Sequence, residues 1–117
     1  MDVLSAEDFK NLVKAGKTAE VKSILRNIPP HEQFARLRLV NQDDPESGLR
    51  PLHWAASRGH GELASALAAA GAELEATTAR LGSTALHYAA SKGHAEVARR
   101  LLEAGAGVDR RAGAGEG

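Results

Sequence analysis

Residues 48–60 read GLRPLHWAASRGH, and residues 82–94 read GSTALHYAASKGH. Each residue of the first segment lies 34 positions before its counterpart in the second, and the same offset continues without a gap to residue 109. Upstream, Gly16 lies 43 positions before Gly59, so an earlier copy carries nine extra residues. A fixed period of this length is the sequence sign of a repeat protein, in which each copy is one supersecondary unit.

The repeat register divides the chain into three copies within a single domain, residues 1–109. The first copy covers about residues 5–41, is divergent, and carries its insertion near residues 29–39. The second and third copies cover residues 42–75 and 76–109. Residues 110–117 are rich in glycine and alanine, which predicts a flexible tail.

Both regular copies carry signals for two helices separated by a turn. The hydroxyl of Thr84 can cap a helix, and Pro51 suits a first helical position. Gly59 and Gly93 can adopt the left-handed conformation that ends a helix. In each second helix the apolar residues recur at steps of three or four and share one face. These residues are Leu63, Ala66, Leu67 and Ala70 in one copy, and Val97, Leu101 and Leu102 in the other.

The first copy predicts a helix pair of the same kind. Its apolar residues are Phe9, Leu12 and Val13, followed by Val21, Ile24, Leu25 and Ile28. Pro29 and Pro30 end the second helix. The inserted residues 31–39 permit either a short helix around Phe34 or an extended segment, of which we favour the helix.

Residues 50–56 (RPLHWAA) and 83–90 (STALHYAA) resemble the Thr-Pro-Leu-His-x-Ala-Ala signature of ankyrin repeats. The resemblance implies an all-α solenoid of stacked antiparallel helix pairs with hairpin-like fingers, in which the first copy acts as an N-terminal cap. It also implies that the two motif histidines bond to the backbone of the adjoining finger. Arg50 departs from the signature where a capping Thr is expected, and Ala85 replaces its Pro. The expected structural motif residues are Leu52, His53, Gly59, Leu86, His87 and Gly93.

Composition excludes several other classes of protein. Fifteen Lys and Arg balance fifteen Asp and Glu, which disfavours nucleic-acid binding through the arginines at 99, 100, 110 and 111. No cysteine is present, so disulfides and thiolate chemistry are excluded. No secretory signal and no apolar run long enough to span a membrane occur, so we expect no membrane partner. The expected location is intracellular, in the cytoplasm, with the nucleus left open.

No catalytic or metal-binding pattern emerges. His53 with His60, and His87 with His94, repeat at one spacing, but no acid or cysteine repeats beside them, which favours a structural role. The two serines at 57 and 91 lack a nucleophile elbow and an orienting acid. The acids at 43, 44 and 46 fall in a turn, where we expect water to surround them. The prediction is a protein that is not an enzyme and needs no cofactor or metal.

The remaining function is recognition of a protein or peptide by a rigid scaffold. In the ankyrin resemblance the partner site is the concave face of fingers and first helices. Stacking would place Arg58 and Lys92 in a row beside Trp54 and Tyr88, which favours an acidic partner; the alternative is that both rings belong to the core. The expected partner-binding residues are Asp44, Glu46, Ser47, Leu49, Trp54, Ser57, Arg58, Arg80, Leu81, Ser83, Tyr88, Ser91 and Lys92.

Two further expectations concern the C-terminal end. No polar capping repeat follows Val97 and Leu101, which predicts a monomer or weak self-association through an uncapped end. The alternative function is an N-terminal adaptor in a longer enzyme or effector.

Overall fold

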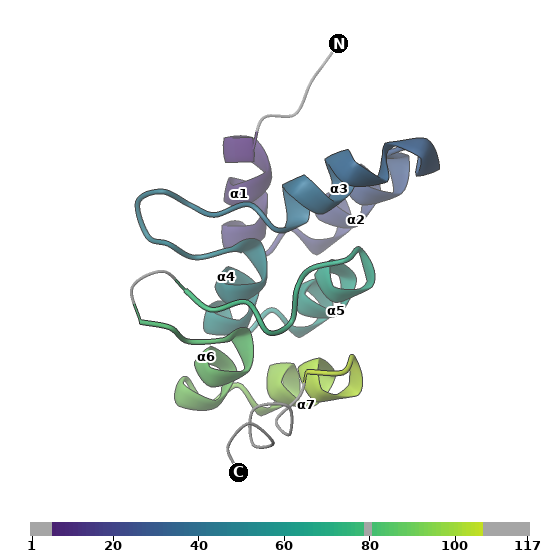
Figure 1. The fold of residues 1–117 in the computed structure, drawn as a ribbon. Coiled ribbons are helices and arrows are strands. Elements are labelled where there is room, and N and C mark those ends of the chain that lie inside the picture. Colours follow the sequence, from purple (N-terminus) through teal and green to yellow (C-terminus); the bar gives the residue numbers. More distant parts are fainter. Residues whose placement is uncertain (1–5, 79–80, 107–117) are drawn as a thin grey trace.

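A computed structural model of the chain describes residues 6–78 and 81–106. Figure 1 shows their path as a stack of helix pairs joined by loops. The helices are α1 (Ala6–Ala15), α2 (Thr18–Asn27), α3 (Gln33–Val40), α4 (Pro51–Arg58), α5 (Gly61–Ala69), α6 (Ala85–Ser91) and α7 (Ala95–Glu103), with a 3-10 turn, η1 (Pro30–Glu32), before α3. The described residues contain no strand.

The helices form two layers. Helices α1, α4 and α6 stack on one another to make the first layer, and α2, α5 and α7 stack to make the second (Figure 1). Each pair, α1 with α2, α4 with α5 and α6 with α7, is one of the three repeats. The prediction of an all-α stack of helix pairs is therefore confirmed. The predicted tail at residues 110–117 lies outside the described residues.

One apolar core runs through all three repeats because neighbouring pairs cover each other's apolar faces. Its fully buried members include Phe9 and Val13 in the first repeat, Leu63 and Leu67 in the second, and Leu101 in the third. The expectation that Leu102 shares the buried face of α7 is wrong, since 47% of this residue is exposed. Successive helical residues point about 100° apart, so burying Leu101 turns its neighbour outward.

The predicted helix ends are confirmed. The Oγ of Thr84 accepts a hydrogen bond from the backbone N–H of His87, and Pro51 is the first residue of α4. Gly59 and Gly93 follow their helices with φ angles of 79° and 77°. This left-handed conformation suits glycine, which has no Cβ to clash with the next carbonyl group.

The insertion in the first repeat is helical, as favoured from the sequence. Helix α2 ends at Asn27, the 3-10 turn begins at Pro30, and α3 follows it and leads to the loop before α4 (Figure 1). Phe34 does not anchor this helix in the core, since 74% of it is exposed. Val40, at the other end of α3, is fully buried and joins the insertion to the core.

The loops before α4 and α6 make the same hairpin-like turn. In the first loop, Asp44 N–H donates to the carbonyl of Leu49, and Gly48 N–H donates to the carbonyl of Asp44. In the second loop Thr78, which lies 34 residues after Asp44, forms the equivalent bonds with Ser83 and Gly82. The fingers implied by the ankyrin resemblance are thus present before both helices.

Candidate functional site

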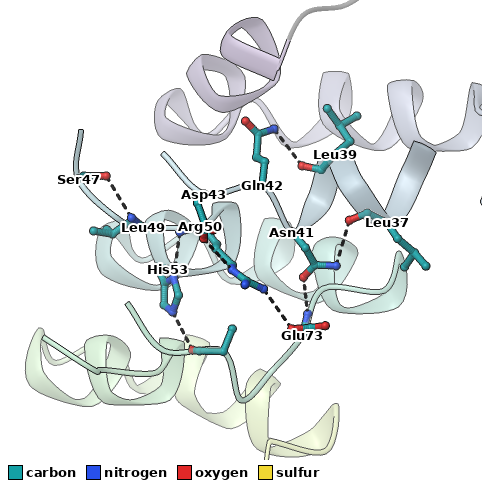
Figure 2. A network of polar contacts seen from close by, with 11 residues as sticks. Leu37, Leu39, Asn41, Gln42, Asp43, Ser47, Leu49, Arg50, His53 and Glu73 are labelled. Carbon is teal, nitrogen blue, oxygen red and sulfur yellow. Dashed lines mark hydrogen bonds and ion pairs between the residues drawn. The ribbon is translucent and has the colours of Figure 1, made fainter. Parts of the chain in front are cut away.

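His53 joins two successive repeats (Figure 2). Its side chain is buried, Nδ1 accepts a hydrogen bond from Arg50 N–H at 3.0 Å, and Nε2 lies 3.0 Å from the carbonyl oxygen of Ala76 in the next finger. Because Nδ1 must accept, the proton lies on Nε2, which donates to Ala76. Burial lowers the pKa of His53, and the nearby Arg50 charge lowers it further, against the opposing effect of the Ala76 bond.

His87 occupies the equivalent position in the third repeat but is exposed. Its Nδ1 accepts a hydrogen bond from Thr84 N–H at 3.1 Å. This contact lies at the start of α6, within the repeat that contains His87. The expected bond to a following finger concerns residues outside the described part of the chain.

In the first repeat, Lys10 stands where the other two repeats have the motif histidine. Its Nζ lies 3.2 Å from Asp44 Oδ1 in the next finger and 3.1 Å from Glu7 Oε1. The carboxylate of Asp44 also accepts hydrogen bonds from Ser47 Oγ at 2.8 Å and Glu46 N–H at 3.3 Å. Lys10 therefore connects the first two repeats as His53 connects the next two. The sequence signal was present, because Lys10 precedes His53 by the offset of 43.

The expectation that water surrounds Asp44 is wrong, because this residue is only 6% exposed. Burial raises its pKa, but the hydrogen bonds from Ser47, Lys10 and the Glu46 backbone outweigh that effect and hold the pKa below its ordinary value. The bonds to Glu7 and Asp44 raise the pKa of Lys10. Asp44 is thus committed to the finger and is not a contact available to a partner.

Asp44→Asn should lower the free energy of unfolding by about 1.5 kcal/mol near neutral pH, since it removes the charge that three donors share. Since the folded pKa of Asp44 is lowered, its contribution is present above the ordinary aspartate pKa and is lost as the pH falls below about 4. Urea unfolding of both proteins across this range measures the difference. Glu20→Gln is the control, because it removes an exposed carboxylate that forms no ion pair among the described residues. A difference between wild type and Asp44→Asn that grows toward low pH would contradict the assignment.

Arg50 makes ion pairs in place of the missing cap. Its Nε lies 3.0 Å from Asp43 Oδ1, and Nη1 lies 3.1 Å from Glu73 Oε1 in the following loop (Figure 2). Asn41 reinforces this junction. It donates to the carbonyl groups of Leu37 and Gly71 and accepts from Glu73 N–H. The contacts with Gly71 and Glu73 were not predicted from the sequence, since they join residues 23 to 32 positions apart.

The histidines that follow glycine pack against the preceding repeat. The His94 ring lies against Gly59, and its Nε2 is 3.1 Å from the Ser57 carbonyl oxygen. His60 packs against Gly16 in the same way. Across residues 6–78 and 81–106, no three His, Cys, Asp or Glu side chains gather as a metal site. His53, His60 and His94 thus each contact a neighbouring repeat, whereas the described hydrogen bonds of His87 lie within its own.

Trp54 and Tyr88 are half-buried and pack against the core, so each ring combines a core role with an accessible edge. Lys14 Nζ lies 4.5 Å from the Trp54 ring centroid, and the Arg58 guanidinium carbon lies 5.4 Å from it. Tyr88 meets the His53 ring edge-on, with centroids 5.9 Å apart. Lys14 is a cation of this surface that the sequence analysis missed, because its contact with Trp54 crosses from one repeat to the next.

The other candidate residues divide between helices and fingers. On the helices Ser57 is half-buried and Ser91 is exposed, and Lys92, which directly follows α6, is also exposed. In the fingers Glu46 is exposed and 74% of Leu81 is exposed. Arg80 lies outside the described residues. Half-buried positions are occupied by Ser47, whose hydroxyl bonds to Asp44, and by Leu49 and Ser83.

Two stacked layers of short helices, with fingers projecting from one layer, define a helical-repeat solenoid. A family model described as ankyrin repeats (3 copies) matches residues 10–112. The chain belongs to the ankyrin repeat family. Ankyrin repeats are generally modules for protein–protein interaction and are typically not catalytic. A search of curated proteins found no match. None of the helices described is both long and apolar enough to cross a lipid bilayer.

Proposed function

We propose that this protein binds an acidic segment of a protein partner on its inner-helix face. This surface is formed by the first-layer helices and contains Lys14, Trp54, Arg58, Tyr88 and Lys92. The fingers beside it, with the exposed Leu81, extend the contact. The proposal includes no chemical reaction on the partner.

The observation that carries the proposal is the cluster of unpaired cations around Trp54. Lys14 and Arg58 lie over its ring, and no carboxylate of the described residues forms an ion pair with them or with Lys92. A carboxylate or phosphate on a partner would supply the missing counter-charges, while the ring supplies apolar contact area. Complementary charge of this kind favours an acidic partner.

The arginines of α7, in the second layer, support placing the site on the first layer. Arg99 bonds to Glu96 and Glu103, and Arg100 bonds to Glu96. Their charges are thus neutralised within the helix, unlike those around Trp54. The inner-helix face also rests on the buried core, so little conformational entropy would be lost on binding.

Arg58→Glu is expected to weaken partner binding at least about tenfold, because it replaces an attractive charge beside Trp54 with a repulsive one. The measurement is a pull-down from cell extract with wild type and each variant as bait, in which the amount of each retained protein is quantified. The affinity of the protein retained best by wild type is then measured by titration. Arg38→Glu is the matched control: Arg38 is also exposed and lacks an ion pair among the described residues, but it lies on α3. Circular dichroism verifies that both variants fold.

Equal retention by wild type and both variants would place the binding surface elsewhere and refute the proposal. Equal losses in the two variants would indicate a response to net charge alone, which also refutes it. The supporting result is a selective loss of partner binding in Arg58→Glu that Lys92→Glu reproduces. Binding by the wild type should also weaken at high salt.

A further inference from the structure

A cleft of about 380 Å³ lies between α2, α3 and α5, in the second layer and separate from the inner-helix face. Its third wall is α3, the helix formed by the inserted residues. The cleft is therefore a property of this chain's insertion and not of a regular helix pair. Its lining is Lys22, Leu25, Arg26, Arg36, Ala66, Ala69 and Ala70.

The cations of this cleft are incompletely neutralised. Lys22 Nζ lies 3.5 Å from Glu62 Oε2, but neither Arg26 nor Arg36 forms an ion pair with any described carboxylate. The Nε of Arg36 is buried and has no hydrogen-bond partner. Buried polar groups normally have one, so this nitrogen lacks its usual acceptor.

The ends of the neighbouring helices do not supply that acceptor. Arg26 is in the last turn of α2, and the alanines of the cleft are at the end of α5. Helix C-termini attract cations and disfavour anions, so an oxyanion here would depend on the two guanidinium groups and not on the helix dipoles. The Nε of Arg36 is enclosed by protein atoms, so an oxyanion in the cleft would bond to the terminal Nη groups of Arg36 and Arg26.

We propose that this cleft binds a phosphomonoester, with its phosphoryl oxygens between Arg26 and Arg36 and its apolar part on the alanines and Leu25. Guanidinium groups recognise phosphate through paired hydrogen bonds, and two of them match a dianion better than a monoanionic carboxylate. The volume is within the range of small-molecule sites. The phosphoryl group could belong to a free phosphomonoester or to a phosphoserine side chain, and the experiment separates these two sources.

The test titrates the full chain with phenyl phosphate, benzoate, benzyl alcohol and a phosphoserine pentapeptide, followed by calorimetry and by amide chemical shifts. Wild type is expected to bind phenyl phosphate saturably, at least about tenfold more tightly than benzoate, with no binding of benzyl alcohol. The shifts should be concentrated at residues 22–26 and 66–70. Tighter binding of the pentapeptide identifies a phosphorylated chain as the ligand, and tighter binding of phenyl phosphate identifies a free phosphomonoester.

Arg26→Gln/Arg36→Gln should weaken phenyl phosphate binding at least about tenfold. The charge-matched control is Lys17→Gln/Arg38→Gln, which removes two exposed cations outside both the cleft and the inner-helix face and should leave the affinity unchanged. Should the cleft variant unfold, Arg26→Gln alone serves, because Arg26 is exposed. Equal effects in cleft and control variants, or the absence of saturable binding of both phosphate probes, would overturn the proposal. The inner-helix face is not involved in either result.

Discussion

Replacing His53 by alanine is expected to lower the free energy of unfolding by about 3 kcal/mol near neutral pH. The substitution leaves Arg50 N–H and the Ala76 carbonyl group without their partner, and it opens a cavity between α4 and the next finger. His87→Ala is the matched control, because this histidine occupies the same motif position but is exposed and accepts from Thr84 N–H. Its loss should be about 1 kcal/mol. Urea unfolding monitored by circular dichroism measures both.

The effect of His53→Ala should depend on pH in a defined direction. Because burial lowers the folded-state pKa of His53, the fold favours its neutral form. Its contribution to stability is therefore complete above the ordinary histidine pKa of about 6.5 and declines as the pH falls through the folded value. The difference in unfolding free energy between wild type and His53→Ala should be smaller at about pH 5 than near neutrality. A difference that increases on acidification would show that the charged ring is the stabilising form.

Gly59→Ala is expected to lower the free energy of unfolding by about 2 kcal/mol, roughly twice the loss for Gly93→Ala. The two glycines have nearly equal φ angles, 79° and 77°, so both substitutions carry the same strain of a left-handed alanine. A Cβ at Gly59 would lie 2.9 Å from the His94 ring, whereas one at Gly93 would meet no described atom within 4 Å. The additional loss of unfolding free energy in Gly59→Ala is expected because the new Cβ displaces His94 from the Ser57 carbonyl group.

The comparison of these two variants isolates the contact between repeats from the conformation of the glycine. Urea unfolding of both variants gives the difference in their free energies of unfolding directly when these free energies depend equally on urea concentration. Making both glycine substitutions in a His94→Ala background adds a check. Without the ring, Gly59→Ala should lower the free energy of unfolding little more than Gly93→Ala does. Equal losses for the two glycine variants in the presence of His94 would mean that the ring does not lock the repeats together.

Much of the fold could be predicted from the sequence because its determinants are local. The 34-residue period, the apolar steps of three and four, Thr84, Pro51 and the glycines that follow the helices each act within one helix or one turn. The helical insertion was also favoured correctly, although the exposure of Phe34 was not foreseen. Helical spacing states which residues share a face, but it does not state whether a neighbouring element covers that face.

The candidate site was predicted less completely. Counting repeats places Arg58 and Lys92 at equivalent positions, which are the last residue of α4 and the residue directly after α6. The burial of Asp44 could not be predicted in this way. It depends on Lys10, which lies 34 residues earlier and stands in place of the motif histidine. Likewise Lys14 reaches Trp54 from the preceding repeat, so neither helix alone indicates the contact.

The amino-acid sequence by itself determined that this protein is a stack of three helix pairs, since helix periodicity, capping and turn conformation are properties of short segments. Only the tertiary structure decided which charges are neutralised and which remain unpaired. Asp44 is buried where Lys10 pairs with it, and Arg50 joins Asp43 to Glu73. The cations over Trp54 and the two arginines of the α2, α3 and α5 cleft form no ion pair with a described carboxylate. The reason is that electrostatic pairing depends on distances of a few ångströms between side chains from different repeats.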